Sequence, residues 1–283
     1  MALKDVFANH PGIGSLETNI SSFITKKAVR NLESYRCDAT LPPSFCEYFR
    51  YPPMFADSDG QGAATGTAGD ENLLMTRDSA WRYHIIGTQT IVMPVWDSTA
   101  AGGGLNIGMD QTNGDGVELA AGVTSRAAFV LVAGTDGGFF DVDLTVADVS
   151  GAAELAVGWR KCAAFTAAID DYTDLACLNM QGGNVFIETI LNNATTVSTD
   201  TTVDMADADQ IRLRVEVDST GACRFLAGVL ATPTVAGPVA AIPATTAAFT
   251  FDSGDVIMPF VYFKHGSDVA GAVNIQHMKC GYL

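Results

Sequence analysis

Basic residues are scarce in this chain. Only 16 Lys and Arg stand against 32 Asp and Glu, which gives a formal net charge of −16 at pH 7. A charge of this sign repels a phosphate backbone, so we expect no direct binding to nucleic acid. The acidic residues are dispersed along the chain, which is typical of a solubilising outer surface.

Long apolar runs are also lacking. The first ten residues do not combine a basic start with an apolar stretch, as a secretory signal does, and no later segment is apolar for long enough to span a bilayer. We therefore expect synthesis in a cytoplasm and no membrane partner. The six cysteines permit disulfides by their even number, but without export we expect free thiols.

Motifs for catalysis and cofactor binding are missing as well. The chain has no Gly-x-Ser-x-Gly nucleophile elbow and no Gly-x-x-x-x-Gly-Lys phosphate loop. None of its four histidines lies in a motif with a nearby acid and nucleophile. His277 and Cys280 offer two zinc ligands, but no second pair has the proper spacing. We expect no catalytic residue, no cofactor and no bound metal.

One oxygen-rich loop leaves two interpretations open. The segment from Asp110 to Gly116 combines oxygen donors with glycines, which a calcium ion could use. It departs from the EF-hand pattern, so the preferred interpretation is a plain Asn-Gly or Asp-Gly turn between strands.

Apolar material, in contrast, is plentiful. Hydrophobic residues make up 48% of the chain and charged residues 17%, which is enough for a large core. Between Gln210 and Asp218 apolar and polar residues alternate at every step, the period of a strand with one buried and one solvated face. A short loop containing Gly221 joins this strand to the next, over 222–229, and predicts a hairpin. Similar runs lie at 139–146, 154–161, 174–180, 184–191, 256–265 and 272–283, and upstream at 81–95, 104–109 and 116–122.

Because no helical periods separate these strands, the pattern favours an antiparallel all-β sandwich. Within it, Asp141 and Asp143 share one strand face and are the best carboxylate pair for a glycan hydrolase. The Glu-x-Asp-x-x-Glu run of sandwich-type glucan hydrolases is absent. We therefore interpret the pair as part of a solvated strand face whose apolar neighbours point inward.

The first 80 residues differ from the rest. Apolar residues at helical spacing between Leu16 and Leu32 predict an amphipathic helix, which docks either on its own domain or on a neighbouring subunit. Proline pairs at 42–43 and 52–53 force extended backbone. We divide the chain into an anchoring arm, residues 1–80, and a β-sandwich domain, residues 81–283. Five aromatic residues of the arm need a surface to lie against, and we predict that they bind a partner: Phe45, Tyr48, Phe49, Tyr51 and Phe55.

The strand runs at 139–144, 209–218, 223–228 and 259–264 resemble those of a concanavalin-like or laminin-G-like jelly-roll sandwich. Together with the helix and the aromatic arm, they resemble structural proteins of tailed-phage virions. The resemblance implies a non-enzymatic capsid decoration (cement) protein, assembled in the host cytoplasm and located in the virion. Its implied partners are the major capsid protein or other virion subunits and further copies of itself. Metal and sugar ligands of concanavalin-like lectins do not carry over, because no matching motif is visible.

Two alternatives remain beside this interpretation. A tail-associated carbohydrate-binding adhesin would stack aromatic side chains on a sugar, and Trp81, Trp96 and Trp159 are the most able to do so, although core burial is the commoner fate of tryptophan. A glycan hydrolase on the sandwich would use Asp141 and Asp143.

Overall fold

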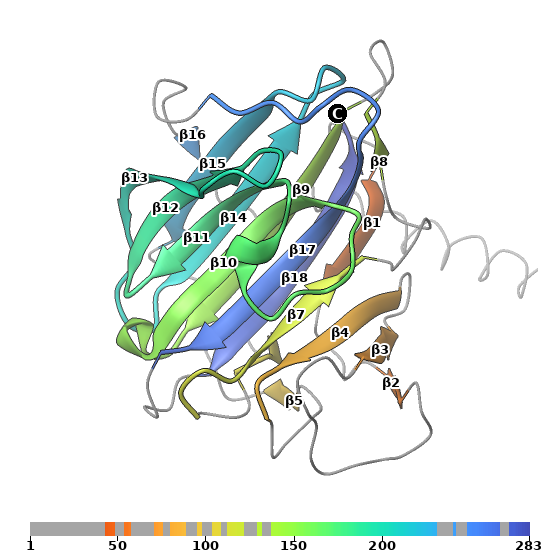
Figure 1. Cartoon of the computed structure of the whole chain (residues 1–283). Helices are drawn as coiled ribbons and strands as arrows, with labels where there is room; N and C mark the ends of the chain where they lie inside the picture. Colours follow the sequence, from red (N-terminus) through yellow and green to blue (C-terminus); the bar gives the residue numbers. More distant parts are fainter. Residues whose placement is uncertain are drawn as a thin grey trace, which may run out of the picture. The chain divides into compact units, whose positions relative to one another are not determined.

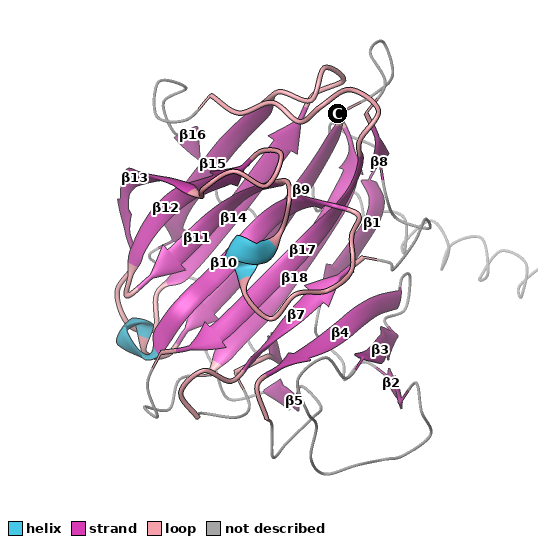
Figure 2. Ribbon diagram, in the orientation of Figure 1, coloured by secondary structure: helices cyan, strands magenta, loops and turns pink. Residues whose placement is uncertain are grey.

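The computed structural model describes residues 43–48, 54–57, 71–75, 80–88, 95–97, 104–108, 112–121, 129–131, 137–230, 240–241, 248–266 and 272–283. They belong to one compact unit, Pro42–Leu283. Its strands form two antiparallel sheets, here named sheet A and sheet B (Figures 1 and 2). The helix predicted between Leu16 and Leu32 lies outside the described residues. Among those described, no helix has the length and apolar character needed to cross a membrane.

In the described part of the chain, sheet A has eight strands. In spatial order they are β16 (Ala240–Ala241), β15 (Cys223–Leu230), β14 (Gln210–Val217), β9 (Gly138–Val146), β18 (Val273–Tyr282), β6 (Gly104–Asn106) and β5 (Val95–Asp97), and β1 (Pro43–Tyr48) also pairs with β18. Strands far apart in sequence are therefore neighbours, as β9 is to both β14 and β18.

Sheet B has ten strands among the residues that the structure describes. In spatial order they are β13 (Val197–Asp204), β12 (Asn184–Ile190), β11 (Leu175–Gln181), β10 (Ala152–Lys161), β17 (Val256–His265), β7 (Gly116–Ala120), β4 (Ala80–Ile86), β3 (Glu71–Met75) and β2 (Met54–Asp57), and β8 (Phe129–Val130) also pairs with β17. Two 3-10 turns, η1 (Val149–Gly151) and η2 (Ile169–Asp171), flank β10.

The core lies between the sheets, where the apolar half of each alternating strand is buried. The rings of Trp81 on β4 and Phe140 on β9 meet across it, with their centroids 5.8 Å apart. The indole Nε1 of Trp159 on β10 donates a 3.0 Å hydrogen bond to the carbonyl of Val215 on β14. Trp81 and Trp159 are fully buried, so neither can stack on a sugar. The side chain of Trp96 lies outside the described residues.

The predicted fold class is confirmed as an all-β antiparallel jelly-roll sandwich, and the hairpin between β14 and β15 is confirmed with it. Asp218 fixes the turn of that hairpin by accepting hydrogen bonds from the backbone N–H groups of Thr220 and Ala222, at 2.8 and 3.0 Å. Gly221 adopts φ 89°, a conformation that favours glycine. Thr112–Asp115 forms a turn on the connection from β6 to β7, as preferred from the sequence. The backbone N–H of Asp115 closes the turn by donating a 3.0 Å hydrogen bond to the carbonyl of Thr112.

Strands also arise from the segment that the sequence analysis assigned to the arm. In sheet A, β1 pairs with β18. In sheet B, β2 pairs with β3 and β3 pairs with β4, so the sheet contains strands from both sides of residue 80, the predicted end of the arm. Phe45 and Tyr48 belong to β1 and Phe55 to β2, whereas Phe49 and Tyr51 lie outside the described residues. None of these five side chains is described. Their assignment to a partner surface therefore stays a prediction, and so does the division into an arm and a domain.

Candidate functional site on the outer face of sheet B

The carboxylate pair singled out in the sequence lies on the outer face of sheet A, away from the core. Asp141 and Asp143 are 0% and 1% exposed, so the prediction of a solvated strand face was wrong. Alternation shows which residues share a face, but it does not show what covers that face. Neither carboxylate is open to a glycan.

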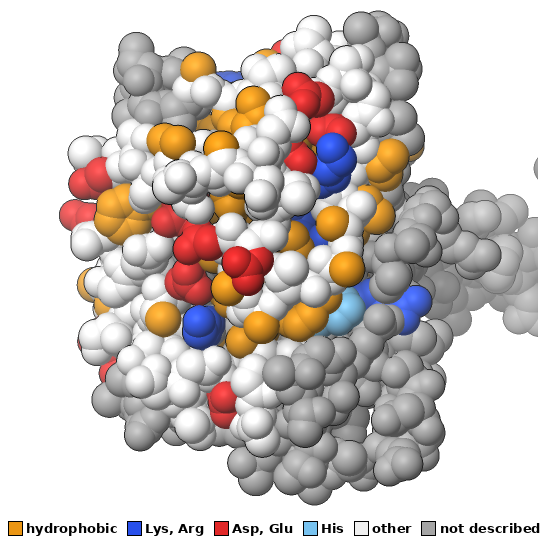
Figure 3. Space-filling view, viewed as in Figure 1, with side chains coloured by type: hydrophobic (Ala, Val, Ile, Leu, Met, Phe, Trp, Pro, Cys, Tyr) orange, Lys and Arg blue, Asp and Glu red, His pale blue; other side chains and the backbone are white. Residues whose placement is uncertain are grey.

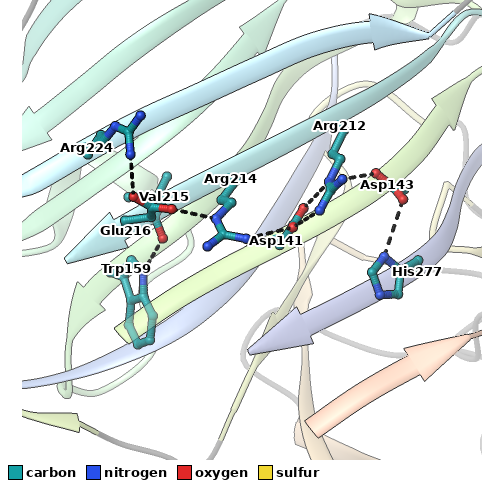
Figure 4. A network of polar contacts seen from close by, with 9 residues as sticks. All are labelled: Asp141, Asp143, Trp159, Arg212, Arg214, Val215, Glu216, Arg224 and His277. Carbon is teal, nitrogen blue, oxygen red and sulfur yellow. Dashed lines mark hydrogen bonds and ion pairs between the residues drawn. The ribbon is translucent and has the colours of Figure 1, made fainter. Parts of the chain in front are cut away.

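A ladder of alternating charges explains how the acids tolerate burial (Figure 4). Asp141 accepts a 2.8 Å hydrogen bond from Nε of Arg212 and lies 3.5 Å from Nη1 of Arg214. Arg214 in turn donates to Glu216 at 2.8 Å, and Asp143 lies 3.3 Å from Nδ1 of His277. Because each buried charge faces an opposite one, the ladder supports the sheet and supplies no free acid–base pair.

The zinc pattern is divided between two environments. His277 points to the charge ladder, whereas Cys280, three residues along the same strand, is packed in the core between the sheets. Within the described part of the chain, no three His, Cys, Asp or Glu side chains are placed to hold a metal ion. Cys162, Cys177, Cys223 and Cys280 are free thiols.

The outer face of sheet B differs because a segment of the chain crosses it. Most of the connection from β10 to β11, residues 162–173, carries η2 and lies in front of the sheet in Figures 1 and 2. We name it the strap. Ile169 and Tyr172 of the strap are buried in a second apolar cluster with residues of the sheet face beneath: Ile86, Ala120, Ala156, Leu175, Cys177, Ile190, Met258, Phe260 and Tyr262.

A buried polar group fastens the strap to the sheet. The Tyr172 hydroxyl donates a 2.6 Å hydrogen bond to one carboxylate oxygen of Glu118 on β7, and Nη2 of Arg160 on β10 donates to the other at 2.7 Å. The Arg160 guanidinium also lies 4.3 Å from the centre of the Tyr172 ring. Burial raises the pKa of Glu118, while Arg160 and the Tyr172 hydrogen bond oppose that shift. We name these three residues the latch.

Further contacts hold the strap across the width of the sheet. The Phe165 ring stacks on His84 of β4, with their centroids 4.6 Å apart and their planes 8° from parallel. The Tyr262 hydroxyl of β17 donates to the carbonyl of Ala167 at 2.8 Å. At the other side, Thr196 in the β12–β13 loop donates to Asp170 at 2.6 Å. The strap therefore covers the sheet face from β4 to β12.

Beside the strap, part of the same face stays open and carries a row of polar side chains. Asn184 stands opposite Gln181 on neighbouring strands, and Glu154 stands opposite Lys264. Because Leu155 pairs with Met180, Glu154 lies next to Gln181. The result is a transverse row, Asn184–Gln181–Glu154–Lys264, across β12, β11, β10 and β17. Asn184 is exposed and the other three are half-buried.

An aromatic ring and a held carboxylate border this row. Phe186, two residues after Asn184 on β12, is half-buried on the same face. Glu188, two residues further, accepts hydrogen bonds from the side-chain amides of Asn179 at 2.7 Å and Gln181 at 2.8 Å. These two bonds fix the orientation of the Glu188 carboxylate and of the Gln181 amide, so this part of the row is organised before any ligand arrives.

Negative charge gathers on the strap side of the row, and Figure 3 shows acidic side chains over β10 and β11. Burial raises the pKa of Glu154, the Asp170 and Glu188 carboxylates add to the shift, and Lys264 opposes it. Burial likewise raises the pKa of Glu188, and the amides of Asn179 and Gln181 oppose that shift.

Sequence reasoning missed this site. Glu154 and Lys264 are 110 positions apart and meet only because β17 pairs with β10. Each residue of the row, taken alone in the sequence, has the pattern of an ordinary solvated strand face.

No protein-family model and no curated protein matches the sequence. Among solved structures, the chain is similar to the metal-free exoplasmic/lumenal domain of VIP36, with a TM-score of 0.50 and 10% identity over 86% of this chain and 93% of that one. Weaker similarities include a legume lectin-like domain from Entamoeba histolytica, with a TM-score of 0.46 and 8% identity over 71% and 90%. Another is alginate lyase A1-II′ of polysaccharide lyase family 7, with a TM-score of 0.39 and 10% identity over 74% and 82%.

The similarity to the VIP36 domain agrees with the jelly-roll sandwich described above. At this level of identity the comparisons concern the fold alone, so function has to be argued from the site.

Proposed function

We propose that the protein binds a glycan on the open part of the outer face of sheet B. The observation that carries the proposal is the transverse row, Asn184–Gln181–Glu154–Lys264. Sugar hydroxyls donate and accept hydrogen bonds, and the row offers amides that do both, a carboxylate that accepts and an ammonium that donates. The Phe186 ring beside it supplies an apolar surface for a sugar face.

The proposal takes up the carbohydrate-binding alternative and prefers it to capsid decoration. A shared fold with VIP36 supports a scaffold that presents a broad sheet face, while the row supplies the chemistry. The decoration role depends on the five aromatic residues of the arm and stays a prediction. Its test is the joint replacement of these five aromatic residues by alanine in the full chain, followed by a measurement of attachment to virion particles.

We further propose that the site binds without cleaving. The two acidic groups beside the row are engaged, since Glu188 accepts from two amides and Asp170 accepts from Thr196. Glu154 is left as the one acid of the row, opposite Lys264 on the neighbouring strand. Incubation with each bound glycan should release no new reducing ends. Cleavage by the wild-type protein that persists after removal of contaminants would contradict this part of the proposal.

The binding test is a glycan array followed by titration of each hit. Phe186→Ala and Gln181→Ala should each weaken binding about tenfold, which corresponds to a loss of roughly 1.4 kcal/mol. The matched control is Tyr282→Ala, an aromatic side chain that is 50% exposed at the end of β18 in the other sheet. An array without hits, or equal affinities for all four proteins, would sink the proposal.

A further inference from the structure

We infer that the ligand is a linear oligosaccharide lying across the strands of sheet B, alongside the strap, so that the protein reads an extended stretch and not a single sugar. This inference rests on the proposed function and adds the direction and length of the ligand.

The length follows from the register. The four side chains of the row come from four consecutive strands, β12, β11, β10 and β17, and therefore span three inter-strand spacings. With neighbouring strands about 4.8 Å apart, the Asn184 and Lys264 backbones are separated by roughly 14 Å. One sugar ring does not reach both ends, whereas a short chain of sugars does.

The direction follows from the strap. The neighbours of Glu154 and Lys264 on the same face are Ala156 on β10 and Tyr262 on β17, which pair with each other. Both lie under the strap, because they belong to the buried cluster beneath it. The Tyr262 hydroxyl already donates to the strap carbonyl of Ala167 at 2.8 Å. A glycan that followed β10 or β17 in this direction would meet the strap after one step. A glycan that crosses the strands stays on the open row.

The latch holds the strap in a fixed position against sheet B. Glu118 and Arg160 are 0% and 1% exposed, and both are engaged with each other and with Tyr172. Releasing the strap would take the Tyr172 hydroxyl from the Glu118 carboxylate and the Tyr172 ring from Arg160, and leaving a buried carboxylate without its donor is costly. We therefore treat the strap as a fixed border of the proposed binding surface in the ligand-bound protein as well.

The test uses size series of linear manno-, gluco- and N-acetylchito-oligosaccharides, from mono- to hexasaccharide, titrated against the full chain. For the series that binds, affinity should rise at least tenfold from the monosaccharide to a plateau. A monosaccharide that binds as tightly as the longest oligomer, with Phe186→Ala still harmful, would overturn the inference and leave the proposed function standing. No binding by any series, together with an array without hits, would overturn both.

Variants at the two ends of the row give a second readout. Asn184→Ala and Lys264→Met should each weaken binding of the longest oligomer, and their fold-changes should multiply in the double variant because the sites are far apart. For a disaccharide, the loss in the double variant should be about the size of the loss of one contact and well below the product found for the longest oligomer, since the ligand reaches one end at a time. Equal losses for both ligands would contradict a chain that spans the row. Unchanged urea midpoints confirm that the variants are folded.

Discussion

Arg212 on β14 and Asp141 on β9 form a two-point ion pair on the outer face of sheet A, with Nε of Arg212 2.8 Å from Oδ1 of Asp141. Asp141 is fully buried, and Arg212 is 9% exposed. Asp141→Ala should lower the free energy of unfolding by roughly 3–5 kcal/mol, because it leaves the Arg212 and Arg214 guanidinium groups buried without their shared carboxylate. Urea unfolding at pH 7 measures the change.

The control for this prediction is Arg224→Ala at the solvent end of the same ladder. Its side chain is 61% exposed and lies 3.3 Å from Glu216, so its loss should change stability by less than about 0.5 kcal/mol. If both variants lost the same amount, the ladder would be screened by solvent along its whole length, contrary to the burial described above.

The sequence predicted the sandwich because strand alternation is a local property. The alternating run from Gln210 to Asp218 predicted the bounds of β14 to within one residue, and the run after its turn predicted those of β15 equally well. β13 was missed because Val197–Asp204 is a sheet edge with mostly exposed Ser, Thr and Asp side chains, and such a strand has no buried face to impose alternation.

The candidate site could not be predicted in the same way. The polar sides of β9 and β10 look alike in sequence, yet Asp141 is buried in an ion pair and Glu154 belongs to the open row. The difference arises from strand order and from what crosses each face. Residues 162–173 show no periodicity, and only the fold places Phe165 and Tyr172 over strands β4 and β7.

The latch predicts a local loss of order in the strap. Tyr172→Phe removes the hydrogen bond to Glu118 and leaves a buried carboxylate oxygen without that donor, which costs about 1–3 kcal/mol. Backbone amides of the strap should therefore exchange with deuterium faster in the variant, while amides of β9 and β14 keep their wild-type rates.

Thr196→Val is the comparison variant, because it removes a hydrogen bond to Asp170 that is exposed to solvent at the far end of the strap. Its effect on strap exchange should be much smaller. Faster exchange in both variants alike would show that the strap is held at the β12–β13 loop and not by the buried latch.

Gly158 marks a place where β10 and β11 approach too closely for a side chain. A Cβ on residue 158 would lie 2.3 Å from the carbonyl oxygen of Ala176, a backbone atom that cannot move aside freely. Gly158→Ala should destabilise the protein by roughly 1–3 kcal/mol, the usual cost of overpacking. Gly266→Ala, whose Cβ would come no nearer than 3.0 Å to any atom, should cost clearly less in the same urea experiment.

His84 should give the stability a distinct pH dependence. Burial, with the Arg160 and Arg82 charges acting in the same direction, lowers the pKa of His84 from 6.5 to about 4. The unfolded chain therefore takes up this proton first as the pH falls. Stability from this residue is complete above about pH 6.5, is lost between about pH 6.5 and 4, and changes no further below that, with a total of up to about 3 kcal/mol.

His84→Phe keeps a flat ring against Phe165, which stacks on His84 at 4.6 Å, and removes the titration. The difference in unfolding free energy between wild type and variant, measured in urea at intervals from pH 7.5 to 4, isolates His84 from the carboxylates that titrate in both proteins. The wild type should lose stability relative to the variant as the pH falls through this window, because only the wild-type unfolded chain gains the imidazole proton. A difference that stayed constant over the whole range would mean that His84 titrates alike in the folded and unfolded chains, and that the stacked ring is open to solvent.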